Sequence, residues 1–146
     1  MKKITLFEDF IFEFDYPDHD KHKDKWINFL FNDAKYRNLY YTQNANKHIV
    51  FTKPILHKIP EFDPITNFLH ESVNKVMDHT GYYPETTITS MWGTLQQETN
   101  YHHLHTHGNA FLVGLYYLHT MKNNATGTVF YNNNSSRNNI INPRRR

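Results

Sequence analysis

The sequence predicts an α+β domain in which N-terminal helices pack on an antiparallel sheet. Helical patterns occupy the first half of the chain and short β patterns the second, without the strand–helix alternation of a parallel sheet. A length of 146 residues suits one domain. Phe, Tyr and Trp make up 16% of the residues, which provides mass for a buried core. The succession of late strands suits a jelly roll.

The first elements are expected to be one strand and one helix. Residues 3–14 form an amphipathic strand pattern whose apolar side chains share one parity, namely Ile4, Leu6, Phe10, Phe12 and Phe14. A turn follows at residues 16–20. Trp26, Phe29 and Leu30 then fall at i, i+3 and i+4, which predicts an amphipathic helix over residues 21–31.

The middle of the chain contains the most clearly bounded helix. Residues 34–47 are polar and have no period, so we expect a loop, followed by a short strand at 48–52. Asp63 as N-cap, Pro64 at the first helical position and Gly81 as C-cap bound the next helix. Its apolar stripe comprises Ile65, Leu69, Val73, Val76 and Met77.

The second half is expected to be mostly β. Strands are predicted at residues 86–95, through the histidines, at 111–118 and at 127–131, with turns at 96–100 and 121–126. We therefore divide the single domain 1–146 into a supporting part, 1–85, a β-core, 86–131, and an Asn- and Arg-rich tail, 132–146.

Charge and composition exclude few functions. The formal net charge is +2, which requires neither nucleic acid nor an anionic membrane as partner. The chain has no cysteine, so disulfides and thiolate metal sites are excluded. No apolar run approaches the roughly 18 residues of a membrane span, and acidic residues interrupt any signal-peptide core. We expect a soluble protein of the cytoplasm, or of the host cytoplasm or virion if a phage encodes it.

Four of the eleven histidines lie between His102 and His107. In a strand, His103, His105 and His107 would line one side, and His102 the other. An H-x-H pair offers two imidazoles to one centre, and neutral imidazole is the commonest protein ligand for transition metals. The alternatives are a solvated surface, a nucleic-acid contact and a packed strand with polar edges. The apolar run that follows, from Ala110 to Leu118, places the pair at the mouth of a buried layer and favours a metal site at His105 and His107.

The same residues carry a resemblance. His105-Thr-His107-Gly-Asn109, then Gly114–Leu118, then Gly127–Phe130 resemble the H-x-H-x-N…G-[VL]-Y-Y-[LVI]…G-x-[VL]-F pattern of a 2-oxoglutarate/Fe(II)-dependent oxygenase family found in phages and marine bacteria. Trp92 matches an aromatic that precedes the histidine motif. The resemblance implies a double-stranded β-helix of the jelly-roll or cupin-like kind, Fe(II) at His105 and His107, 2-oxoglutarate as cosubstrate, and hydroxylation of an unidentified substrate.

The chain departs from this family after the motif. Such enzymes use two His and one carboxylate, and here His107 stands where the acid is usual. The family's second His and its basic residue for 2-oxoglutarate come later, whereas 39 residues follow His107. The barrel is then expected to be incomplete: truncated, completed by a second chain or homo-oligomer, or retained without catalysis. A local third ligand would be His103, or His119 or Glu98 through a turn.

Two further residues are candidates for binding 2-oxoglutarate, Tyr117 from its position in the predicted strand and Asn109 from the resemblance. Tyr117 could present its phenol to the carboxylate of 2-oxoglutarate, although both Tyr116 and Tyr117 can equally be core aromatics. Asn109 matches the family asparagine or is a turn residue after Gly108.

Three other classes were compared. A cupin expects a Glu after the second His, where Phe111 and Leu112 stand, and the H-x-H-x-D-H pattern of metallo-β-lactamases fails at Asn109 and Ala110. A non-catalytic jelly-roll binding protein or virion structural protein stays the alternative to the oxygenase.

Overall fold

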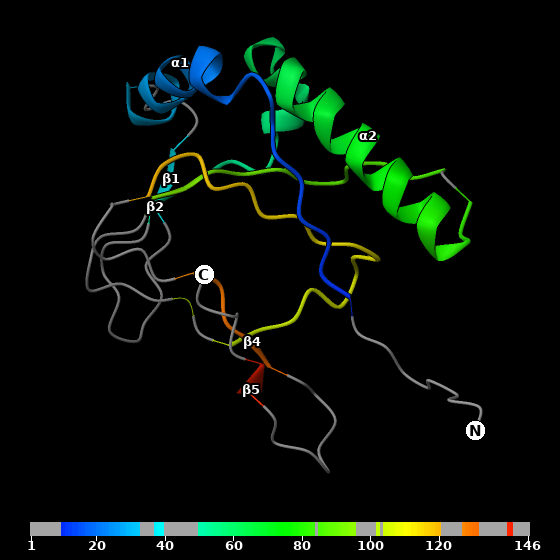
Figure 1. Ribbon diagram of the computed structural model, residues 1–146. Helices are drawn as coiled ribbons and strands as arrows, with labels where there is room; N and C mark the ends of the chain where they lie inside the picture. The colour runs from blue at the N-terminus through cyan, green and yellow to red at the C-terminus, as the bar shows by residue number, and fades with distance from the viewer. Residues whose placement is uncertain are drawn as a thin grey trace, which may run out of the picture.

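The computed structural model describes residues 10–32, 37–39, 50–83, 85–95, 102, 104–120, 127–131 and 140–141 (Figure 1). Two helices dominate this part of the chain, α1 over His19–Asn32 and α2 over Asp63–Thr80. They lie together on one side of the molecule, above the extended segments (Figure 1). Neither helix is long and apolar enough to cross a membrane, within the residues described.

Both helices confirm the sequence prediction, with small shifts at their ends. α1 begins two residues before the predicted Lys21 and ends one residue after Phe31. Two short 3-10 helices, η2 over Leu56–Lys58 and η3 over Pro60–Phe62, lead directly into α2. Asp63 is therefore the first residue of α2 rather than its cap. In this position its carboxylate interacts favourably with the positive end of the helix dipole.

The C-terminal end of α2 is closed by Gly81. This residue is in the left-handed region at φ 77°. The Tyr82 N–H donates to the Met77 carbonyl at 2.9 Å, and the Gly81 N–H donates to the Asp78 carbonyl at 3.3 Å. This pair of bonds is the Schellman arrangement that a glycine after the last turn predicts.

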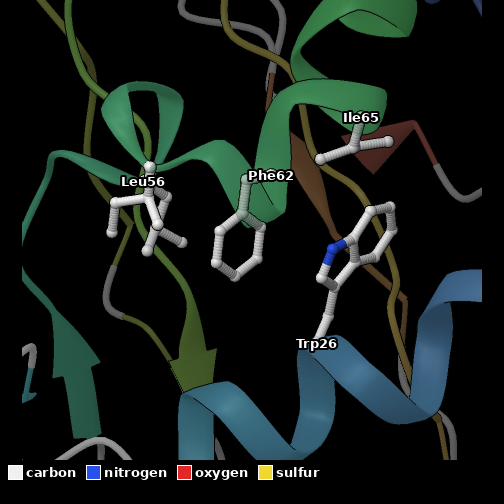
Figure 2. Packing of buried hydrophobic residues seen from close by; sticks show 5 residues of the cluster. Trp26, Leu56, Phe62 and Ile65 are labelled. Atoms are coloured by element: carbon white, nitrogen blue, oxygen red, sulfur yellow. The ribbon is translucent and has the colours of Figure 1, made fainter.

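A small apolar core holds the helices together. It comprises Trp26, Leu56, Ile59, Phe62 and Ile65. Figure 2 shows Trp26 reaching from α1 toward Phe62 and Ile65, and its ring stacks on that of Phe62 with centroids 5.9 Å apart. The Trp26 indole N–H donates to the Glu61 carbonyl at 2.7 Å, so its one polar atom is satisfied. On the predicted stripe of α2, Ile65, Val76 and Met77 are buried.

The strands are short and form two small sheets. In the first, β1 (Arg37–Leu39), β2 (Val50–Thr52) and β3 (Thr94–Leu95) pair antiparallel in that order. The register pairs Asn38 with Phe51 and Phe51 with Thr94. In the second sheet, β4 (Phe130–Tyr131) pairs antiparallel with β5 (Ile140–Ile141). An isolated parallel bridge joins Ile55 to Met91.

The predicted double-stranded β-helix is wrong. Residues 10–14 and 104–120 are extended or bent and belong to no strand, and of the predicted strand at 86–95 only Thr94–Leu95 is in a sheet. Alternation of apolar and polar residues indicates an extended backbone, but a strand also needs a partner that supplies hydrogen bonds along its length. Part of the loop predicted at 34–47 is β1, whereas the predicted strand at 48–52 contains β2.

Several predicted elements lie outside the described residues. They are the first part of the N-terminal strand, residues 3–9, the turns at 96–100 and 121–126, and most of the tail at 132–146.

Candidate metal centre

His105 and His107 lie side by side. Their ring centroids are 5.0 Å apart, with the ring planes at 68° to each other. The backbone between the bend at Leu104 and the turn at Gly108 belongs to no helix or strand, and the two rings meet across the one residue that separates them. His105 is exposed and His107 is half-buried. The pair thus faces solvent on one side and protein on the other, as an accessible metal site requires.

Trp92 lies beside this pair. Its ring centroid is 6.0 Å from that of His107, with the planes tilted by 36°. The residue after it is fixed to β2 by two bonds: the Gly93 N–H donates to the Thr52 hydroxyl at 2.9 Å, and the Thr52 N–H donates to the Gly93 carbonyl at 3.0 Å. A side chain at position 93 would lie 3.1 Å from a Leu30 methyl carbon, so glycine permits this close approach. The sheet and α1 therefore position Trp92 against His107.

His102 also joins the cluster. Its ring centroid is 6.0 Å from that of His105 and 5.5 Å from that of Phe51 on β2. Partial desolvation, with a smaller contribution from His105, lowers the pKa of His102. Strand parity predicted His102 on the opposite side from His105. The bend at Leu104 interrupts the alternation and brings the two rings together.

The geometry of the pair fits two ligands on one ion. Metal–nitrogen bonds of about 2.1 Å place an imidazole ring centre about 3 Å from the ion, so two adjacent ligands have ring centres about 5 Å apart. The observed 5.0 Å is compatible with this spacing and is also an ordinary distance between two aromatic rings packed edge to face. Within the described part of the chain, no three His, Cys, Asp or Glu side chains form a group that could hold an ion. His103 and Glu98, both considered as third ligands, lie outside that part.

The two residues assigned to cofactor binding, Asn109 and Tyr117, make their hydrogen bonds or turn contacts with other parts of the chain than the His105 and His107 rings. Asn109 is exposed in a turn closed by the Ala110 N–H, which donates to the His107 carbonyl at 3.1 Å. The Tyr117 hydroxyl lies 2.5 Å from the Thr128 hydroxyl and accepts the Thr128 N–H at 3.0 Å. Their roles toward 2-oxoglutarate stay predictions, while the turn alternative for Asn109 agrees with the backbone.

Of the two neighbouring tyrosines, Tyr116 packs against the core and Tyr117 does not. Its hydroxyl lies 2.5 Å from Nδ1 of His19 at the start of α1. A second pair of the same kind lies beside it, since the Tyr16 hydroxyl is 2.8 Å from Nδ1 of His22 and the two tyrosine rings meet edge to face. Burial is the main cause that raises the pKa of Tyr116, with Tyr16 and Asp20 adding to it. Burial, followed by Asp18, raises the pKa of Tyr16.

This tyrosine–histidine cluster was not predicted. The i, i+3 spacing of His19 and His22 on α1 puts both rings on one face of the helix, which was the available signal. The sequence does not indicate that residue 116 meets them. The cluster attaches the segment that follows the histidine pair in the sequence to helix α1.

Comparisons of the chain with protein-family models, with curated proteins and with solved structures found no match.

Proposed function

We propose that this protein holds a divalent transition metal between His105 and His107 and acts as a 2-oxoglutarate/Fe(II)-dependent oxygenase. The observation that supports the proposal best is the spacing of the two rings, 5.0 Å between their centroids. The spaced motif from His105 to Phe130 favours Fe(II) among the metals that imidazole binds. The proposal does not depend on the barrel fold, which the described part of the chain does not form.

The proposed site gives each of its residues a distinct role. His105 and His107 bind the ion as neutral imidazoles, and Trp92 limits how far the His107 ring can turn. When bound, Fe(II) supplies the activation of O₂ that couples oxidative decarboxylation of 2-oxoglutarate to hydroxylation. One oxygen atom enters succinate, the other enters the product hydroxyl, and CO₂ leaves. The exposure of His105 leaves this side of the site open to both cosubstrates.

Turnover of 2-oxoglutarate tests the oxygenase proposal. The purified chain, loaded with Fe(II) without oxygen, is mixed with 2-oxoglutarate and O₂, and succinate is quantified. We expect more succinate from the iron-loaded chain than from a metal-free sample. The double variant His105→Ala/His107→Ala should form none, and His79→Ala, which removes an exposed histidine of α2, should match the wild type. Succinate formation by the double variant would refute the assignment.

A second candidate function, a module that associates with a second copy of this chain, is favoured by a different observation. Four large side chains with the same parity are each more than half exposed: Phe111, Val113, Leu115 and Tyr117. Exposed apolar side chains that gather on one surface mark interaction sites. The segment is extended and has no strand partner among the described residues. Two copies related by a two-fold axis could pair these rows with each other.

Oligomeric state tests this second candidate. We expect light scattering after size-exclusion chromatography to give the mass of a dimer for the wild type. The double variant Val113→Ser/Leu115→Ser should give that of a monomer. Wild type that elutes as a monomer at high concentration would exclude it.

A further inference from the structure

The tyrosine–histidine cluster, formed by Tyr16, Tyr116, His19 and His22, lies beside the core and takes no part in the function proposed above. We infer that it is a redox-active site for one-electron oxidants of the peroxyl-radical class. The oxidant takes one electron from a tyrosine, and the phenol proton moves to the histidine bonded to that tyrosine. This inference is independent of metal binding at His105 and His107.

Each phenol of the cluster has its own proton acceptor. The Tyr116 hydroxyl lies 2.5 Å from Nδ1 of His19, and the Tyr16 hydroxyl lies 2.8 Å from Nδ1 of His22. A neutral imidazole that carries its proton on Nε2 accepts a hydrogen bond at Nδ1, so the phenol then donates. Both distances are within the reach that direct proton transfer requires. Loss of an electron from the ring can therefore be coupled to loss of the proton.

The surroundings of the phenols make this coupling necessary. Burial is the main cause that raises the pKa of Tyr116 and of Tyr16, and Asp20 and Asp18 add to it respectively. Both phenols therefore keep their protons at neutral pH. A phenol that loses an electron becomes a very strong acid, so its oxidation is favourable only where a base takes the proton. The carboxylates of Asp18 and Asp20, which flank His19 in the sequence, favour the imidazolium that results.

The cluster is continuous with the indole of Trp26. The Tyr16 ring lies 6.1 Å from that of Tyr116 and stacks on that of Trp26 at 5.8 Å. The Trp26 N–H donates to the Glu61 carbonyl at 2.7 Å, and a carbonyl oxygen is too weak a base to take the proton. An electron vacancy that passes among the three rings is thus trapped on a tyrosine, where a histidine accepts the proton. The His22 ring is stacked on Trp26 at 5.0 Å, where the indole face stabilises an imidazolium.

The proposed step balances in electrons and protons. A peroxyl radical gains one electron and one proton from water and becomes a hydroperoxide. The tyrosine loses one electron, its O–H bond breaks, and an N–H bond forms at Nδ1 of the histidine. The products on the protein are a neutral tyrosyl radical and an imidazolium. A thiol that returns one electron becomes a thiyl radical once its proton is lost to solvent, and the imidazolium returns its proton to the phenol.

Flash photolysis of the full chain with photogenerated tris(bipyridine)ruthenium(III) as oxidant tests the site. The tyrosyl radical is followed by its absorption and by electron paramagnetic resonance. Tyr16→Phe/Tyr116→Phe keeps both rings and removes the hydroxyls, and Tyr82→Phe/Tyr83→Phe, at residues that are 57% and 90% exposed, is the matched control. We expect a long-lived radical in the wild type and in the control, and its loss in Tyr16→Phe/Tyr116→Phe. The same long-lived radical in Tyr16→Phe/Tyr116→Phe would overturn the inference.

The double variant His19→Asn/His22→Asn tests the proton acceptors. The amide oxygen of asparagine can accept the phenol hydrogen bond in place of Nδ1, but it cannot take the proton. A positioned base contributes about 100- to 10,000-fold to a rate, so we expect the long-lived radical to form at least about 100-fold more slowly. Added imidazole buffer should restore part of the rate. An unchanged rate in a variant with wild-type circular dichroism would overturn the inference. His19→Asn in the Tyr16→Phe background repeats the test on one pair, with the same expected loss, should the double variant fail to fold.

Discussion

Tyr116 and Tyr117 are neighbours in the sequence and lie in opposite environments. Tyr116 is half-buried, packs against the core and bonds to His19, whereas Tyr117 is 53% exposed and bonds to Thr128. Alternation along an extended chain predicted that the two would point to opposite sides. It could not predict which side meets the core, because that depends on where α1 lies.

These two tyrosines give a matched pair of variants. Tyr116→Ala removes core contacts and a buried hydrogen bond, so we expect the free energy of unfolding to fall by about 2–3 kcal/mol. Tyr117→Ala removes an exposed side chain and should cost less than about 1 kcal/mol. Urea denaturation of both variants and the wild type measures the difference. Equal losses would contradict the packing of Tyr116 on α1.

His57 predicts a pH dependence of stability. Its Nδ1 is buried and has no hydrogen-bond partner within the part of the chain described. Burial, followed by Lys58 and His70, lowers the pKa of this histidine below its usual 6.5. The unfolded state then binds a proton that the folded state resists. The contribution of His57 to stability is therefore complete above the usual pKa of 6.5, and it is lost as the pH falls from there through the lowered pKa of the folded state.

The comparison of wild type with His57→Phe isolates this contribution. We expect the free energy of unfolding of the wild type to fall between pH 7.5 and pH 5.5 by more than that of the variant, as measured by urea denaturation. Parallel pH profiles for the two proteins would show that His57 titrates alike in the folded and unfolded states.

At the scale of elements, the helices were predictable, whereas the extent and the pairing of the strands were not. Each boundary signal of α2, from Pro64 to Gly81, acts within one turn of the helix, and the core stripe follows from spacing along one element. Strand pairing joins residues far apart, such as Phe51 and Thr94, and local alternation carries no information about the partner. The same limit explains the error at His102, where a single bend reverses the predicted side.

The cap of α2 gives a direct test at this scale. Gly81→Ala introduces a Cβ at φ 77°, where side chains are unfavourable, although no atom lies within 4 Å of it. We expect a loss of about 1 kcal/mol in the free energy of unfolding, entirely from the backbone. Gly108→Ala, equally free of neighbouring atoms but without a left-handed φ, is the control and should lose less. The midpoint temperatures of thermal unfolding of Gly81→Ala, Gly108→Ala and the wild type measure this difference.

For the whole molecule, stability depends on a small core between α1, α2 and the two 3-10 helices. Trp26 is its largest member and is only 1% exposed. Trp26→Ala would remove its contacts with Phe62 and its bond to Glu61, at a cost of about 3–5 kcal/mol. We expect the variant to lose its near-ultraviolet dichroism and to unfold at much lower urea concentration. A variant as stable as the wild type would mean that α1 does not pack as described.

The proposed metal site depends on this arrangement as a whole, because β2, the segment of Trp92 and the segment of the histidines come from three separate parts of the chain. The proximity of the His105 and His107 rings was predictable, because the two residues are two positions apart in the sequence. The proximity of Trp92, Phe51 and His102 was not, since it arises from sheet pairing and the bend at Leu104.

Equilibrium dialysis against Fe(II) without oxygen, with metal and protein quantified in the same sample, tests the central proposal most directly. We predict one ion per wild-type chain, and none in His105→Ala/His107→Ala that keeps the wild-type circular dichroism. Absence of iron from the wild type, or an equal content in the folded double variant, would contradict a metal site at His105 and His107.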